Sequence, residues 1–382
     1  MAITAKIEVS EKDVLGALRG FFEDLLKLDE IKAILVPQHL PTKNMVMPTL
    51  VTEPDHLNGV DPLAPAFPMN TAKIISKLTR RPSGAKIVAV LRPCEIRAFF
   101  ELVKLKQGSA DGVVLIGIDC LGAYPNKDYA RFIEQNGNDS TLKFYKNILS
   151  GKHEKIEGVD LAAACKACEH PVATNADVSI GLYGIDLNDQ LLIQSQTEAG
   201  MNLLNQLELS EIDEPASRKD AIAAVVARRT VYRDEMFAET REATKNLVKM
   251  TAYFASCINC FNCRVACPVC YCKECVFVTD VFNHDPSQYL RWASRKGIIK
   301  MPTDTLFYHI TRLAHMSTAC VGCGQCSNAC PNDIPVMELF RTVAHGTQQA
   351  FEYEAGKSID QEPPLSVFYE NEFPEVVGIR NE

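Results

Sequence analysis

Residues 86–120 read KIVAVLRPCEIRAFFELVKLKQGSADGVVLIGIDC and indicate the fold class of the first half of the chain. Two continuous apolar runs, Lys86–Leu91 and Gly112–Cys120, flank a segment of helix length. Apolar runs rich in β-branched residues are typical of strands that are buried on both faces, and a helical crossover makes such strands parallel. The sequence therefore predicts a βαβ unit within an α/β domain.

Two cysteines follow these predicted strands, Cys94 after the first and Cys120 after the second. Because parallel strands end at the same edge of a sheet, both thiols are expected at the edge where open α/β folds place their ligands. Cys165 and Cys168 form a CxxC motif further along, and the four thiols together match the needs of one [4Fe-4S] cluster. Alone, CxxC also fits zinc or a redox dithiol, and Cys94 also fits a small buried hydrophobe. Taken together, the four favour a cluster.

The rest of the first half alternates between helix and strand patterns. The predicted helices are Glu11–Lys27, Thr71–Leu78, Tyr129–Leu149 and Glu198–Leu207, and the predicted strands are Ala33–Val36, Met47–Thr52 and the apolar runs in 176–184 and 191–195. Residues 217–254 contain good helix formers and no Pro or Gly, so they predict one or two long helices. We predict domains at 1–212 and 256–345, a helical linker at 213–255 and an acidic C-terminal arm at 346–382.

The second half contains the motif CxxCxxCxxxCP twice, at Cys257–Pro268 and at Cys320–Pro331. This is the spacing of bacterial ferredoxins with two [4Fe-4S] clusters, in which the fourth cysteine of each motif binds the other cluster. That rule assigns Cys257, Cys260, Cys263 and Cys330 to one cluster, and Cys320, Cys323, Cys326 and Cys267 to the other. Zinc sites also use CxxC, but they require neither the third cysteine nor the final CP, so zinc is the weaker interpretation.

The 52 residues between Cys267 and Cys320 exceed the connection of a minimal ferredoxin. Part of this insert, Pro302–Met316, has helical spacing, which favours an α-helical ferredoxin domain. His309 and His315 on this helix could bind a cluster or carry protons, but surface or core-edge positions are the favoured interpretation. The insert also holds Cys270, Cys272 and Cys275, one thiol short of a ligand set. A fourth cluster with a distant ligand and thiols that bind nothing stay open as alternatives.

The cysteine content and the charge distribution restrict the class of protein. No apolar run approaches the roughly 20 residues of a membrane span, and the N-terminal sequence lacks a signal-peptide core, so we expect a cytoplasmic protein without a membrane span. In that compartment 15 cysteines indicate metal rather than disulfides. The net charge is -8, and residues 351–382 hold eight acids and two bases, which argues against nucleic-acid binding.

The ferredoxin region is basic within this acidic chain. Residues 241–350 contain 11 Lys and Arg against seven Asp and Glu. Two buried clusters with all-thiolate ligands are anionic and need compensating charge, which this excess supplies. A solvated basic face for a partner is the other interpretation, and the two are compatible.

Four blocks of the first half resemble the coenzyme F420 hydrogenase/dehydrogenase beta-subunit family over roughly residues 70–210: VAVLRPCEIRAFFEL, GIDCLG, CKACEHPVATNADVSIGLYG and QSQTEAGMNLL. The resemblance implies FAD and an iron–sulfur cluster held by Cys94, Cys120, Cys165 and Cys168. It also implies electron transfer between a deazaflavin or another acceptor and a partner oxidoreductase. Here the ferredoxin motifs follow this domain, as in bacterial formate dehydrogenase beta subunits, which leaves the use of F420 open. A Rossmann-type NAD site is unsupported, because no GxGxxG follows a strand.

We therefore predict an α/β flavin and iron–sulfur domain followed by an α-helical dicluster ferredoxin domain. The expected cofactors are FAD, two [4Fe-4S] clusters in the ferredoxin domain and a third on the α/β domain. The predicted protein is an electron-transfer subunit of an oxidoreductase complex. Its expected partner is a formate dehydrogenase, a hydrogenase or a heterodisulfide-reductase-like subunit, with a soluble electron carrier as a further candidate. The alternative is a flavin-free iron–sulfur subunit that relays electrons between two partners.

Overall fold

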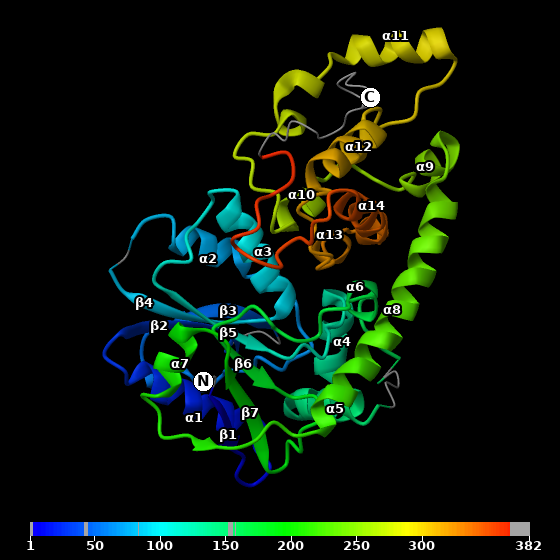
Figure 1. Cartoon of the computed structure of the whole chain (residues 1–382). Helices are drawn as coiled ribbons and strands as arrows, with labels where there is room; N and C mark the ends of the chain where they lie inside the picture. The colour runs from blue at the N-terminus through cyan, green and yellow to red at the C-terminus, as the bar shows by residue number, and fades with distance from the viewer. Residues whose placement is uncertain (1–2, 42–44, 83, 152–155, 157, 367–382) are drawn as a thin grey trace, which may run out of the picture.

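The computed structural model describes residues 3–41, 45–82, 84–151, 156 and 158–366, and it combines a mixed sheet with a helical second half (Figure 1). The described strands form one sheet in the order β3-β2-β4-β5-β6-β7-β1-β8. Strands β2 (Ile31–His39), β4 (Lys86–Leu91), β5 (Val113–Ile118) and β6 (Val178–Gly181) are parallel neighbours. Strands β3 (Val46–Val51), β7 (Gln190–Ser195), β1 (Thr4–Glu8) and β8 (Ser210–Glu211) pair antiparallel.

The predicted βαβ unit is confirmed as β4, helix α3 (Pro93–Lys104) and β5. Residues Ile87 and Val113 begin the parallel register between the two strands, so their carboxyl ends coincide. Cys94 lies in the first turn of α3, and Cys120 lies two residues beyond β5. Both thiols therefore lie at the same edge of the sheet, as the sequence predicts.

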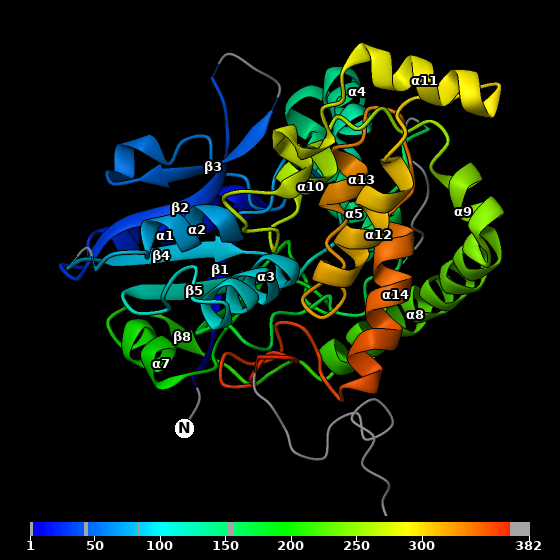
Figure 2. The ribbon, with the colours of Figure 1, turned by 90° about the horizontal axis from the view of Figure 1, so that it is seen from above.

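Helices cover both faces of the sheet, as the alternation along β4 shows. Val88 and Val90 belong to a core with α1 (Val14–Leu26), whereas Ala89 and Leu91 belong to a core with α2 (Ala72–Leu78) and α3. The second core continues into helices of the ferredoxin region (Figure 2). The two halves of the chain therefore share packed apolar residues.

The helical elements complete the chain, and the prediction of one or two long helices over 217–254 is confirmed. The remaining helices of the first half are α4 (Asn126–Asn136), α5 (Ser140–Leu149), α6 (Ala163–Lys166) and α7 (Glu198–Leu204). Those of the second half are α8 (Ser217–Thr244), α9 (Leu247–Tyr253), α10 (Asn262–Ala266), α11 (Pro286–Lys296), α12 (Thr305–Met316), α13 (Gln325–Asn328) and α14 (Val336–Ala350). Among the described residues, no helix has the length and apolar character of a membrane span.

The first part of the predicted C-terminal arm, residues 346–366, packs against the rest of the protein instead of extending from it. Helix α14 runs to Ala350, past the predicted boundary at 345, and the chain then packs against α3. The Tyr353 hydroxyl and the Gly356 amide each donate a hydrogen bond of 2.6 Å to the carboxylate of Glu101. These bonds satisfy one oxygen, Oε1, of a buried carboxylate and hold this acidic segment against the domain. Residues 367–382 of the predicted arm lie outside the described residues.

A buried ion pair fixes the start of α8 against the sheet. Arg218 donates two hydrogen bonds, of 2.6 and 3.1 Å, to the carboxylate of Asp119, which directly precedes Cys120. Arg218→Ala would leave this carboxylate buried without its cation, so we expect a loss of about 3–5 kcal/mol in the free energy of unfolding. Urea unfolding followed by circular dichroism measures the loss, and Lys219→Ala at the exposed neighbouring position is the control. Equal free energies of unfolding in the two variants would contradict the structural role of the ion pair.

Candidate iron–sulfur sites

The four cysteines of the first half line one cavity at the edge of the sheet. Cys94 comes from α3, Cys120 from the end of β5, Cys165 from α6, and Cys168 from the loop that follows α6. Cys323 of the second ferredoxin motif also lines this cavity, together with Gly322. The structure thus brings together all four predicted ligands and places a cysteine of the ferredoxin region beside them.

Burial opposes free thiolates in this cavity. It raises the pKa of Cys94 well above its usual value, and it raises the pKa of Cys120 and Cys165, that of Cys165 to about 12. The charges of Arg92 and Arg229 act in the other direction on the pKa of Cys120, and both residues line the cavity. Thiolates at such a site need a bound cation to stay ionised. The donor set therefore fits an iron–sulfur cluster.

Cys257, Cys260, Cys263 and Cys330 line a second cavity. This set is the one predicted from ligand exchange between the two motifs, because Cys330 belongs to the second motif and the other three belong to the first. Tyr308 and His309 of α12 also line the cavity. The two motifs therefore come together as the ferredoxin rule requires.

Cys267 lies among the cysteines of the second motif. After burial itself, the charge of Cys267 is the largest influence that raises the pKa of Cys320, of Cys323 and of Cys326. A charge shifts the pKa of a thiol in this way only when the two groups lie near each other. The remaining four predicted ligands thus form a third set.

Helix α12 supplies hydrogen bonds to the sulfur atoms of the first motif. The guanidinium of Arg312 donates to Cys263 Sγ at 3.1 Å and to the Cys263 carbonyl at 3.2 Å. Tyr308 Oη lies 3.3 Å from the same sulfur, and His309 Nε2 lies 3.4 Å from Cys257 Sγ. Hydrogen bonds to sulfur tune the reduction potential of a cluster. The basic residues of this region therefore include one that directly compensates thiolate charge.

The two histidines of α12 have different surroundings. His309 is buried and stacks on Phe254 with ring centroids 3.8 Å apart, so the preferred surface or core-edge position is wrong for it. Burial and the charge of Arg312 lower the pKa of His309 to about 3, which keeps the imidazole neutral. His315 is exposed, as expected for a surface histidine.

The three extra cysteines lie beside the ferredoxin sets without forming a complete one. Cys270 is half-buried, and burial together with the charge of Cys267 raises its pKa to about 11. Cys272 is exposed, and Cys275 is partly buried. No cluster of three or more His, Cys, Asp and Glu side chains placed to hold a single metal ion occurs in the described part of the chain.

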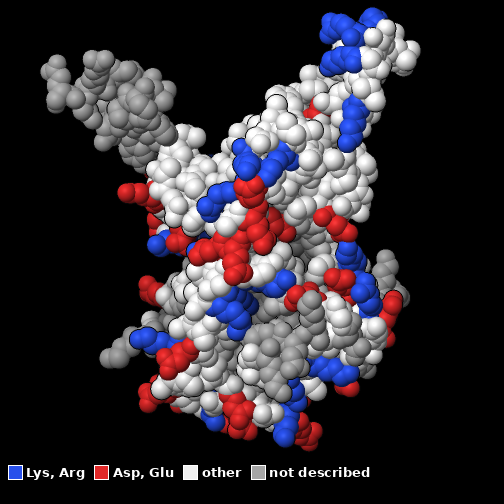
Figure 3. Space-filling model, turned by 90° about the vertical axis from the view of Figure 1, so that its right-hand side faces the viewer, with Lys and Arg blue, Asp and Glu red and all other residues white. Residues whose placement is uncertain are grey.

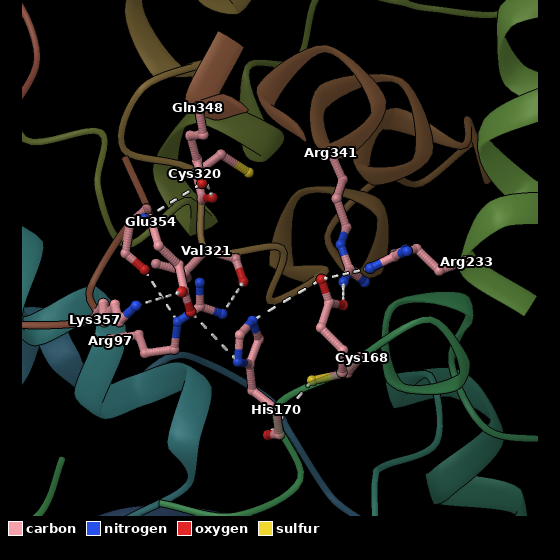
Figure 4. A network of polar contacts seen from close by, with 12 residues as sticks. Arg97, Cys168, His170, Arg233, Cys320, Val321, Arg341, Gln348, Glu354 and Lys357 are labelled. Carbon is pink, nitrogen blue, oxygen red and sulfur yellow. Dashed lines mark hydrogen bonds and ion pairs between the residues drawn. The ribbon is translucent and has the colours of Figure 1, made fainter. Parts of the chain in front are cut away.

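A network of arginines and carboxylates lies between Cys168 and Cys320 (Figure 4). Glu169 accepts hydrogen bonds from Arg233 of α8, at 3.2 Å, and from Arg341 of α14. Arg341 and Arg97 of α3 also favour the thiolate of Cys320 by lowering its pKa against the effect of burial. The network thus joins the α/β and helical halves at the point where two cysteine sets approach each other.

Sequence comparison finds a family match in each half of the chain. Residues 84–216 match the family model for the C terminus of the beta subunit in coenzyme F420 hydrogenase/dehydrogenase. These residues are similar to that family. Residues 253–334 match the model of a 4Fe-4S dicluster domain. The resemblance predicted from the RPCE and CxxC blocks and from the repeated cysteine motif is therefore confirmed.

Three known proteins are similar to this chain. The F420-dependent formate dehydrogenase subunit beta of Methanocaldococcus jannaschii is 27% identical over 373 residues, which cover 92% of this chain and 93% of the relative. The F420-dependent formate dehydrogenase 1 subunit beta of Methanococcus maripaludis is 26% identical over 374 residues, covering 91% and 92%. One chain in the F420-reducing [NiFe] hydrogenase complex from Methanosarcina barkeri has a TM-score of 0.45 and 14% identity, covering 65% of this chain and 94% of that one.

Several residues at these sites are missed by sequence reasoning. Arg229 of α8 lines the first cavity and donates a 3.1 Å hydrogen bond to the Cys120 carbonyl, although it is more than 100 residues distant in the chain. Glu169 and Arg341 are likewise paired only by the fold. Arginines within a long helix carry no motif, so only the packing of α8 and α14 against the cysteine loops identifies them.

Proposed function

We propose that this chain is the beta subunit of an oxidoreductase complex, with FAD and three [4Fe-4S] clusters held by the twelve predicted cysteines. The observation that carries the proposal is the convergence of these cysteines into three sets of four. The similarity to F420-dependent formate dehydrogenase beta subunits supports formate or F420 as the two-electron side of the reaction. The catalytic partner is then a separate subunit of the complex.

The second-motif set adjoins each of the other two sets. Cys323 belongs to the second-motif set and also lines the cavity of the α/β set. The charge of Arg312 acts on Cys263 of one ferredoxin set and on Cys267 and Cys326 of the other. The second-motif set therefore connects the other two. FAD and iron–sulfur clusters, when bound, would supply two-electron and one-electron chemistry respectively.

A separate cavity of about 170 Å³ lies beside the α/β set, with side chains that suit one part of a flavin. It is lined by Tyr124, Lys166, Arg228, Arg229 and Tyr232, among others, and it shares Arg229 with the thiol cavity. Aromatic rings can stack on the planar rings of FAD, and the cations can bind its pyrophosphate. We assign one part of the flavin to this cavity as part of the proposal, because a flavin group there lies next to the α/β cysteines.

The number of irons and the flavin content of the anaerobically reconstituted chain test this proposal. We expect about 12 irons per chain, since each cubane cluster holds four, and about one FAD. Arg228→Gln should lower the flavin content without changing the iron content. A protein with 12 irons and no flavin would favour the flavin-free relay function, and a protein with abundant zinc and little iron would overturn both functions.

A further inference from the structure

Exposed apolar side chains are concentrated in one stretch of the sequence. Of the 17 large hydrophobic residues that are exposed among those described, 13 lie between Leu247 and Ile310. Leu290 of α11 is 71% exposed, and Ile298 just beyond it is 81% exposed. Concentrations of exposed apolar surface in a folded protein mark interaction sites.

Helix α11 is largely exposed, and among the described residues its Tyr289 and Trp292 rings pack on His284. It contains no buried residue, although its sequence is amphipathic. Residues 286–300 carry Arg291, Arg295, Lys296 and Lys300 and no acidic residue. Figure 3 shows basic side chains gathered at the end of the molecule where α11 lies. Helix α11 therefore exposes both apolar and basic side chains.

The segment that follows α11 is bound to a predicted cluster loop. Asn259, between Cys257 and Cys260, donates a 3.0 Å hydrogen bond to the Asp304 carboxylate and accepts one of 3.0 Å from the Thr305 hydroxyl. Cys260 itself is exposed. Ile258 and Val265, on either side of it in sequence, are exposed as well. The set of Cys257, Cys260, Cys263 and Cys330 thus reaches the surface beside the segment that carries α11.

We propose that α11, the segment 297–304 and the exposed loop at Cys260 form a docking face for an acidic electron-transfer protein. This inference rests on the proposed function and adds the site at which single electrons leave or enter the chain. In the transfer, the partner's one-electron centre gains the electron that the Cys260 site gives up, and no bond forms or breaks. The excess of cations favours an acidic partner through charge complementarity, while the apolar groups supply contact area.

A lipid surface is the other class of occupant that a basic amphipathic helix fits. An acidic redox protein is favoured because the same face contains an exposed cysteine of a predicted cluster set. Electron transfer requires such a site near the contact surface, whereas binding to a membrane does not. A helix that binds lipid would also do so without any contribution from the loop at Cys260. The two occupants therefore predict different kinetic results.

The test is the rate at which the full chain, reconstituted with iron and sulfide and reduced with dithionite, reduces two small acceptors. The probes are a rubredoxin, which is acidic, and cytochrome c, which is basic. The variant is Arg291→Glu/Arg295→Glu/Lys296→Glu, and the matched control is Lys12→Glu/Lys32→Glu on the α/β domain combined with Lys219→Glu at the start of α8. At low salt we expect the α11 variant to slow rubredoxin reduction about tenfold relative to the control and to accelerate cytochrome c reduction.

Iron content and electron paramagnetic resonance spectra of both variants are compared with the wild type, so that a folding defect is recognised. Equal rubredoxin rates in the α11 variant and the control would overturn the docking face. Loss of co-flotation with phosphatidylserine vesicles, without a change in the rubredoxin rate, would overturn it in favour of a lipid surface. A wild-type chain that assembles no reducible clusters would instead overturn the proposed function.

Discussion

Cys267→Ser is expected to damage the cluster of the second ferredoxin motif, although Cys267 belongs to the first. Its charge is the leading neighbouring influence on the pKa values of Cys320, Cys323 and Cys326. Serine is a poor ligand for iron, so we expect the loss of up to about four irons per chain or a changed spectrum of that one cluster. Iron analysis and electron paramagnetic resonance of the anaerobically prepared protein measure the effect.

The assignment of the affected cluster needs a second variant. Cys257→Ser should change the other ferredoxin signal, because Cys257 lines the cavity with Cys260, Cys263 and Cys330. Cys272→Ser is the control, since Cys272 is exposed and belongs to none of the three sets. If Cys267→Ser and Cys257→Ser changed the same signal, the exchange of ligands between motifs would be wrong.

The cysteine sets could be predicted because most of their ligands lie a few residues apart in the sequence. The spacing of Cys257, Cys260 and Cys263 allows one turn of chain to present three thiols, and the repeated motif supplies the exchanged fourth ligand. The position of Cys94 and Cys120 follows from strand pattern and from the parallel crossover. Short-range spacing and a topological rule are enough in both cases.

Other features depend on contacts between distant segments. Strand β1 (Thr4–Glu8) is missed by the sequence pattern, because five residues with weak alternation become a strand only through pairing with β7 and β8. Glu101 and Tyr353 are 252 residues apart, and their hydrogen bond turns a predicted arm into a packed segment. Arg229 and Arg341 have no motif around them. Their roles arise from the docking of α8 and α14, which single-sequence patterns do not contain.

The α/β cysteine set has a separate role in the proposed function, because it lies next to the cavity assigned to the flavin and next to Cys323. The second-motif set in turn adjoins the first-motif set through Arg312. Electron tunnelling weakens steeply with distance, so the loss of an intermediate site cannot be offset by greater driving force at the ends. The α/β set is therefore expected to be the obligatory connection between the flavin and the ferredoxin region.

Cys165→Ser should remove about four irons per chain and leave both ferredoxin signals unchanged, since Cys165 lines only the α/β cavity among the thiol cavities. With flavin still bound, we expect the flavin of this variant to accept electrons from a two-electron donor while reduction of the ferredoxin clusters slows by at least about a hundredfold, or about 2.7 kcal/mol in activation free energy. Stopped-flow spectroscopy that follows flavin and cluster absorbance separately measures both events. Cys272→Ser controls for the loss of a thiol outside the three sets. Wild-type cluster reduction in a Cys165→Ser protein shown to lack those four irons would make the α/β cysteines structural, and the flavin would then have to reach the ferredoxin region by another path.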